Sequence, residues 1–155
     1  AAAGVRPGDR VALVMPNCPQ HAVAVLGAMA LGAVVVEHNP LAPAAELRGE
    51  YEAHGARTTI AWTKSLEKLS FLDPGHTVFA MDLVRALPRA SQFLVRLPLR
   101  AARERREQLA ARVPAWARRW DQEVARAEAW QGGPPACRRR PRSPTATSSP
   151  TSSSP

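Results

Sequence analysis

Residues 9–18 read Asp-Arg-Val-Ala-Leu-Val-Met-Pro-Asn-Cys, and residues 31–41 read Leu-Gly-Ala-Val-Val-Val-Glu-His-Asn-Pro-Leu, with an alanine-rich segment between them. The apolar run from Val11 to Met15 is long enough for a buried strand and too short for a helix. A second, β-branched run extends from Val34 to Val36. A strand, a helix and a second strand in this order predict a parallel βαβ unit whose strands are buried on both faces.

The segment between the two runs carries helix signals. Asn17 and Gln20 have the spacing of a capping box, Pro19 suits the first helical turn, and Gly32 is the predicted C-terminal stop. Large apolar residues recur at helical spacing and predict an apolar stripe, the face that amphipathic helices turn toward a core. Its members are Val23, Val25, Leu26, Met29 and Ala30.

Two helices and two strands are predicted downstream. A second helix begins after Pro40, with Pro43 in its first turn, and ends at Gly55, with one face made of Ala44, Leu47, Tyr51 and His54. The segments 58–62 and 77–81 are rich in β-branched and aromatic residues and predict strands. Residues 65–71 form a short helix at best, and Asp73-Pro74-Gly75 predicts a turn. Alternating strands and helices predict an α/β fold, a partial three-layer, doubly wound and mainly parallel sheet.

The sequence motifs around the first two strands resemble a known family. Residues 8–17 and 31–41, supported by Glu46-Leu47 and by His54-Gly55-Ala56-Arg57, are similar to the N-terminal subdomain of the AMP-forming acyl-CoA synthetases, and among these to long-chain fatty acid–CoA ligases. The resemblance covers roughly residues 4 to 100. Relatives carry Leu-Tyr-Thr after Asn-Pro, whereas Leu41 is followed here by Ala42 and Pro43. The matching motifs are structural, so they identify the family without identifying catalytic groups.

The resemblance implies a two-step reaction. A fatty acid carboxylate attacks the α-phosphate of ATP to give an acyl-adenylate and pyrophosphate, and the thiol of coenzyme A then displaces AMP. The family uses a Ser/Thr/Gly-rich phosphate loop ending in Pro-Lys, Mg²⁺, a later acidic residue for the ribose and a lysine of the C-terminal domain. None of these motifs occurs in this sequence: Gly132-Gly133 is followed by two prolines, and Lys64 and Lys68 lie outside any such loop. We therefore assign no catalytic, cofactor-binding or metal-binding residue, and expect none of the family's cofactors to bind this fragment.

Other candidate residues have plainer interpretations. His21, His38, His54 and His76 are too scattered in sequence to indicate a metal site. His38 follows a predicted strand at the end where α/β sheets bind ligands, but local packing or hydrogen bonding is the favoured role. Cys18, near a helix N-terminus, is interpreted as a buried or capping-region thiol rather than a reactive one. Cys18 and Cys137 are the only cysteines and do not form a disulfide framework.

Composition limits the classes of function. The 155 residues suffice for one modest domain, and the net charge of +8 rests almost wholly on arginine. The abundance of arginine, together with that of alanine, is better explained by a GC-rich coding bias than by selection for contacts with phosphate groups. No secretory signal or membrane-spanning segment is visible. The family resemblance implies a cytoplasmic protein, with weak peripheral membrane association as an alternative.

The second half of the chain differs from the first, and we divide it into three parts: a partial α/β subdomain (1–98), a basic helical segment (99–130) and a disordered tail (131–155). Helices are predicted over 99–112 and 115–130. In the second, Trp116 and Trp120 either face an anionic membrane or, as we favour, pack on a part of the domain absent here. The tail contains six prolines, six serines and four arginines with no acidic residue, and we expect it to be disordered and out of frame from about residue 133.

Three hypotheses follow. The first is a fragment of a long-chain fatty acid–CoA ligase that is inactive alone, whose partners are the fatty acid of the intact family and the remainder of the ligase if that is encoded separately. The second is a basic module that binds nucleic acid or an anionic membrane through Arg100–Arg119 and the tail. We do not expect the chain to bind any specific nucleic acid. The third is a truncated product without function.

Overall fold

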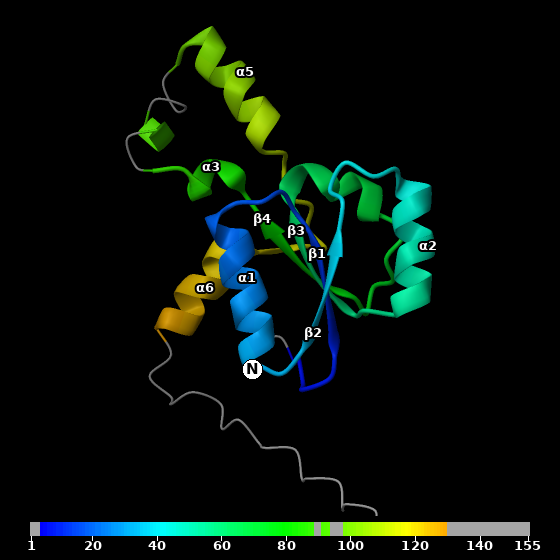
Figure 1. Ribbon diagram of the computed structural model, residues 1–155. Coiled ribbons are helices and arrows are strands. Elements are labelled where there is room, and N and C mark those ends of the chain that lie inside the picture. The colour runs from blue at the N-terminus through cyan, green and yellow to red at the C-terminus, as the bar shows by residue number, and fades with distance from the viewer. Residues whose placement is uncertain (1–3, 89–90, 94–97, 130–155) are drawn as a thin grey trace, which may run out of the picture.

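A computed structural model describes residues 4–88, 91–93 and 98–129. Within them five parallel strands form one sheet in the order β2-β1-β3-β4-β5. In Figure 1, α1 and α6 cover one face of the sheet and α2 covers the other. This is the three-layer, doubly wound α/β fold that the alternation of elements predicts.

The predicted βαβ unit is present. Strand β1 (Arg10–Val14) is followed by helix α1 (Pro19–Ala30) and strand β2 (Val34–His38), and β1 pairs with β2 in parallel. Strand β1 is buried almost throughout, whereas β2 lies at the edge of the sheet and is half exposed. The prediction of burial on both faces is therefore right for β1 and wrong for β2.

Both ends of α1 can be compared with the predicted signals. Gly32 ends the helix with a φ of 72°, a left-handed conformation that favours glycine. The capping box is wrong: the N-cap is Cys18, no side chain caps the helix, and the buried Oε1 of Gln20 has no hydrogen-bond partner among the described residues. Pro19 at the first helical position removes one N–H that a cap would otherwise satisfy.

Most of the apolar stripe of α1 faces away from the sheet, and Val25, which packs against the core, is the exception. Its buried residues are Ala24 and Ala28, whereas Val23, Leu26 and Met29 are 58%, 67% and 62% exposed. The physical reason is that α1 is apolar nearly all round, so side-chain size rather than polarity chooses its face. The small alanines allow the helix axis to approach the sheet, and most of the large side chains remain outside.

The second half of the predicted sheet agrees closely. Helix α2 (Ala44–His54) is N-capped by Pro43 and ends at Gly55, and its buried residues are Leu47 and Tyr51. Strands β3 (Thr58–Trp62) and β4 (Thr77–Met81) have the predicted bounds. Between them lie two 3₁₀ helices, η1 (Thr63–Ser65) and η2 (Glu67–Leu69), in place of the short helix. After β4, the Asp82 carboxylate accepts a hydrogen bond from the backbone N–H of Val84 and so caps α3 (Leu83–Ala86).

The basic segment contains an element that was not predicted. Helix α5 (Arg100–Leu109) lies within the expected range, and its Arg103–Glu107 ion pair is formed at 3.0 Å. The single helix predicted over 115–130 is wrong, because a two-residue strand, β5 (Arg118–Arg119), joins the sheet beside β4 before α6 (Trp120–Glu128) begins.

The core forms one apolar layer on each face of the sheet. The layer under α2 includes Val14, Leu47, Leu66, Leu69 and Val78. The layer under α1 and α6 includes Leu13, Ile60, Phe79 and Met81, with Trp120 packed against it. Trp120 therefore packs within this domain rather than on a membrane or on an absent part, whereas Trp116 is 48% exposed.

No helix in the described part of the chain is long and apolar enough to cross a bilayer. The tail predicted to be disordered and out of frame, 131–155, lies outside the described residues.

Candidate functional site

The carboxyl ends of the parallel strands are the edge at which doubly wound sheets usually bind ligands. Residues 15–18 leave β1 at this edge, and residues 39–43 leave β2. Pro16, Pro19 and Pro40 offer no backbone N–H to a ligand. The Asn39 side chain is used locally, since its Oδ1 accepts a hydrogen bond from the backbone N–H of Leu41 at 2.9 Å.

Both lysines at this edge hold backbone carbonyls. The Lys68 Nζ donates to the carbonyl oxygens of Pro40 (3.3 Å) and Ala42 (2.9 Å), and the Ser65 hydroxyl also donates to Pro40 O at 3.1 Å. The Lys64 Nζ donates to Glu107 O at 2.9 Å. These contacts fasten the 39–42 loop and the end of α5, so both ammonium groups have structural partners.

This edge does not fit the nucleotide and metal that the resemblance implies. A triphosphate needs several convergent N–H donors and available cations, and Mg²⁺ needs a set of oxygen ligands. The loops here contain prolines and the lysines are engaged. Among the described residues, no group of three or more His, Cys, Asp or Glu side chains could hold a metal ion. We therefore assign no step of adenylation to these residues.

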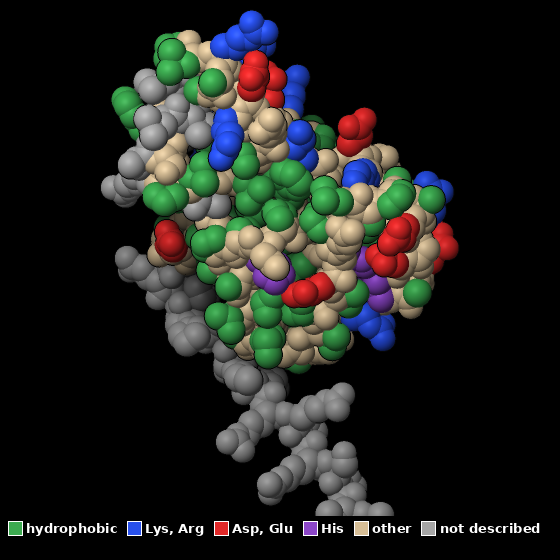
Figure 2. Space-filling view, turned by 45° about the horizontal axis from the view of Figure 1, so that its top comes forward, with side chains coloured by type: hydrophobic (Ala, Val, Ile, Leu, Met, Phe, Trp, Pro, Cys, Tyr) green, Lys and Arg blue, Asp and Glu red, His purple; other side chains and the backbone are tan. Residues whose placement is uncertain are grey.

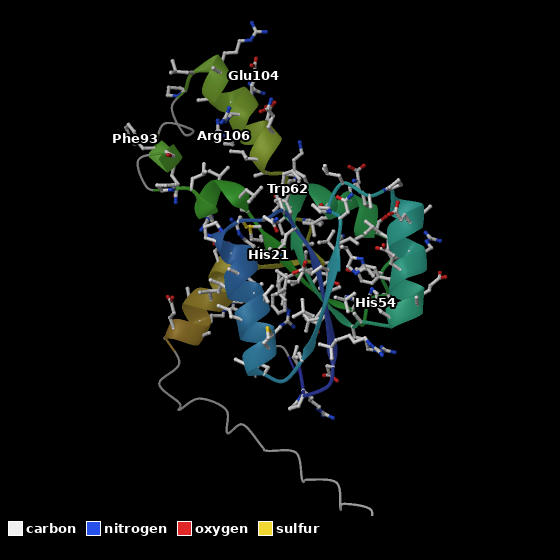
Figure 3. The ribbon with its side chains drawn as sticks, viewed as in Figure 1. His21, His54, Trp62, Phe93, Glu104 and Arg106 are labelled. Atoms are coloured by element: carbon white, nitrogen blue, oxygen red, sulfur yellow. The ribbon has the colours of Figure 1, made fainter. Side chains whose placement is uncertain are left out.

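Polar and aromatic side chains instead gather between α2 and the sheet. We call this group the Tyr51 cluster: His38, Glu50, Tyr51, His54, Thr59 and His76. The His38 side chain is 2% exposed, and its ring stacks on that of Tyr51 with centroids 5.0 Å apart and planes inclined by 14°. Figure 3 shows His54 at the end of α2. The cluster brings together three of the four histidines that the sequence leaves scattered.

The hydrogen bonds of the cluster have a fixed direction. The backbone N–H of Ala56 donates to Nδ1 of His54 at 3.0 Å, so neutral His54 carries its proton on Nε2. That Nε2–H donates to Nε2 of His38 at 3.0 Å. His38 therefore carries its own proton on Nδ1, which donates to the Glu50 carboxylate at 2.5 Å. One backbone amide thus sets the tautomers of two histidines.

A second branch joins the sheet to the loop before β4. The hydroxyl groups of Tyr51 and Thr59 are hydrogen-bonded at 2.8 Å, and the Thr59 oxygen lies 2.8 Å from Nε2 of His76. Thr59 is fully buried, so its hydroxyl depends on these two partners. Burial, with a contribution from the nearby Glu50 charge, raises the pKa of Tyr51 well above its usual range despite the Thr59 hydrogen bond.

The cluster lowers the pKa of two of its histidines. Burial chiefly lowers the pKa of His54, assisted by His38 and Arg10 and opposed by Glu50. Burial also lowers the pKa of His76, assisted by Arg57 and opposed by Asp73. Geometry supports the lowered pKa of His54, because a proton added to its Nδ1 would displace the hydrogen bond from the Ala56 N–H.

Folding stability should therefore fall as the pH falls below about 6.5, the ordinary histidine pKa. Below that value the unfolded chain takes up protons that the folded chain resists, and the slope cannot exceed about 1.4 kcal/mol per pH unit for each histidine. Urea midpoints at pH 7.5 and pH 5.5 measure the effect. The double variant His54→Gln/His76→Gln should flatten the dependence, and an unchanged slope would contradict this account.

A hollow of about 460 Å³ lies beside the cluster, at the amino end of β3 and β4. Tyr51 and His76 form part of its wall, and Arg48 lies over the Phe71 ring at 5.3 Å from the centroid. Arg57 and Asp73 stand at the same hollow with opposite charges. The balance of charge gives it no preference for an anion or a cation.

The remaining sequence candidates lie elsewhere. His21 on α1 pairs with Glu37 at 3.1 Å, on the opposite side of the sheet from the Tyr51 cluster (Figure 3). Cys18 is half-buried at the N-cap of α1, and Cys137 lies outside the described residues. One sequence signal for the cluster was available, because Tyr51 and His54 share the predicted inner face of α2. Nothing in the sequence indicated that His38 and His76 meet them.

Comparisons with known proteins give a consistent picture. Residues 1–143 match the family model described as AMP-binding enzyme. The long-chain-fatty-acid–CoA ligase of Bacillus subtilis is 40% identical over 63 residues, which are 41% of this chain and 11% of that protein. The 4-coumarate–CoA ligase of Pinus taeda is 32% identical over 80 residues, which are 52% of this chain and 15% of that protein.

A solved structure shares the fold. The A domain of a carboxylic acid reductase from Segniliparus rugosus, solved with AMP and a co-purified carboxylic acid, superimposes with a TM-score of 0.58 at 20% identity. The superposition covers 88% of this chain and 21% of that one. The chain therefore spans only a small part of the length of the proteins it matches.

Proposed function

Since the chain belongs to the AMP-binding enzyme family, we propose that it is the N-terminal part of an ATP-dependent acyl-CoA ligase whose acid substrate is a long-chain fatty acid. The similarity to the Bacillus subtilis ligase supports this substrate class. ATP, coenzyme A and Mg²⁺ belong to the proposal for the whole ligase. The described residues contribute a sheet and two packed faces to it rather than reacting groups.

One observation carries the scaffold role. Val23, Leu26 and Met29 of α1 are exposed to solvent, and Val34 at the edge of the sheet is 50% exposed as well. Figure 2 shows apolar side chains exposed on the side of the molecule that it presents. Contact between apolar surface and water is unfavourable by about 25 cal/mol per Å². A layer of protein that covered these side chains would remove this unfavourable contact. We propose that the remainder of the ligase is that layer.

A groove beside α1 extends the same surface. It has a volume of about 270 Å³ and is lined between α1 and α6 by residues that include Val23, Ala28, Ile60, Phe79 and Val124. Its walls are almost wholly apolar, so it suits an apolar side chain or helix from the remainder of the ligase. The same exposed surface predicts poor solubility for the chain alone.

The purified chain should show no ATP–pyrophosphate exchange with a long-chain fatty acid above the background without protein. The physical reason is that its carboxyl edge offers no site for a triphosphate. Exchange should appear when the chain is combined with a long-chain fatty acid–CoA ligase from which the matching segment has been deleted. Robust exchange by the chain alone would refute the scaffold role, and no exchange in the combined sample would refute the assignment as a ligase part.

A further inference from the structure

Helix α5 stands apart from the two core layers. It has no buried residue, and Figures 1 and 3 show it projecting from the body of the domain. We define the α5 arm as Phe93 together with residues 98–109. A ten-residue helix that buries no residue gains little stability from its own hydrogen bonds. Contacts outside the helix must therefore hold it in position.

The arm is fastened at one end. The Trp62 indole N–H donates to Leu109 O at 2.7 Å, and Lys64 Nζ donates to Glu107 O at 2.9 Å. The backbone N–H of Ala111 donates to the Thr63 hydroxyl at 3.2 Å. Trp62 and Lys64 satisfy carbonyls at the C-terminal end of α5, where a lysine is also favoured by the helix dipole. The N-terminal end of the arm therefore points outward from a fixed base.

The arm is basic on balance. Arg100 and Arg103 are paired with Glu104 and Glu107, at 3.3 Å and 3.0 Å. Arg105 and Arg106 are exposed and form no ion pair with any described residue. Figure 2 shows basic side chains along the projecting arm. These two guanidinium groups give the arm a net attraction for anions.

Apolar side chains accompany these arginines. Phe93 is 68% exposed and Leu99 is 60% exposed. Figure 3 shows Phe93 at the outer side of the arm, away from the sheet. Nucleic acid would satisfy the arginines but offers a leucine no apolar environment. An anionic bilayer supplies phosphate groups for the arginines and hydrocarbon for both apolar side chains.

We propose that the α5 arm is a docking surface for anionic phospholipid bilayers. Arg105 and Arg106 contact the headgroups, and Phe93 and Leu99 enter the interface. This goes beyond the proposed function and does not depend on it, because the surface consists only of described residues of this chain. The contact is weak and reversible, because stable attachment to a membrane requires two anchoring signals. A single short basic element with two apolar side chains supplies only one.

Vesicle flotation tests the proposal with the full chain, because aggregated protein stays at the bottom of the gradient while bound protein rises. The probe vesicles are phosphatidylcholine alone and phosphatidylcholine mixed with phosphatidylglycerol. Binding should require phosphatidylglycerol and weaken with salt. Each arginine near an anionic surface contributes a factor of roughly five to partitioning, so Arg105→Gln/Arg106→Gln should lower it roughly 25-fold.

A matched control separates the arm from net charge. Arg6→Gln/Arg118→Gln removes the same charge from exposed positions outside the arm and should bind as the unchanged chain does. Phe93→Ser/Leu99→Ser should lower binding at every salt concentration. All of the substituted side chains are exposed, so the thermal unfolding temperature of every variant should equal that of the unchanged chain. This measurement checks that each variant remains folded.

Three outcomes would overturn the proposal: no flotation with either vesicle, equal flotation with both, or equal loss in the arm variants and the control. Tighter binding to single-stranded RNA than to the anionic vesicles would assign the arm to nucleic acid instead. None of these results depends on ATP–pyrophosphate exchange, so failure here is distinguishable from failure of the ligase assignment.

Discussion

Replacing Leu47 by alanine is expected to lower the free energy of unfolding by about 2–5 kcal/mol, whereas Leu26→Ala should change it by less than about 0.5 kcal/mol. Both leucines lie on helices and both changes remove the same atoms. Leu47 is 0% exposed in the core layer under α2, and Leu26 is 67% exposed on α1. The difference therefore measures burial alone, because helix propensity changes equally in the two variants.

Urea denaturation followed by circular dichroism measures both variants against the unchanged chain. The pair is informative because the periodicity of α1 by itself would place Leu26 in the core. Similar destabilisation by the two substitutions would show that the outward direction of the α1 stripe is wrong. It would also remove the main support for a covering layer.

Leu26→Asp is expected to weaken assembly of this chain with the remainder of a long-chain fatty acid–CoA ligase by roughly a thousandfold or more. Burying a leucine stabilises an interface by about 2–3 kcal/mol, and an unpaired buried carboxylate adds a penalty of similar or larger size. Exchange between ATP and pyrophosphate in the combined sample should fall with it. In the chain alone, the same substitution should leave folding intact and improve solubility.

The matched control is Ala45→Asp, which places the same charge on an exposed position of α2, on the opposite side of the sheet. It should assemble and exchange normally. Binding affinity can be followed by analytical ultracentrifugation of the two separately expressed chains. Unchanged affinity for Leu26→Asp would mean that the α1 stripe is not the covered face.

Much of the sheet could be predicted from sequence because its strands are short, apolar and bounded by prolines, glycines or turns. Strands β3 and β4 begin and end at the predicted residues, and Gly32 and Gly55 end their helices as expected. These signals are local, so no knowledge of the rest of the fold is needed. The family resemblance rests on the same local motifs and is confirmed by the match to residues 1–143.

Features that depend on distant contacts could not be predicted. Strand β5 consists of two arginines, which have no strand signal of their own and join the sheet by pairing with β4. The orientation of α1 depends on which residues fit against the sheet, a question of volume that polarity patterns do not address. In the Tyr51 cluster, His38 meets His54 across 16 residues of chain and Thr59 meets His76 across 17. Only the topology brings these side chains together.

The left-handed turn at Gly55 has an effect beyond ending α2. Its φ of 61° reverses the chain so that the next backbone N–H, from Ala56, meets Nδ1 of His54. A Cβ at position 55 would touch nothing within 4 Å, so Gly55→Ala would act through backbone preference alone, at about 1 kcal/mol. A residue that turns the chain differently would remove the Ala56 N–H from Nδ1 of His54. The proton of each imidazole, in His54 and in His38, could then move to the other nitrogen of its own ring. The positions of two protons inside the domain are thus set by the conformation of a residue that has no side chain.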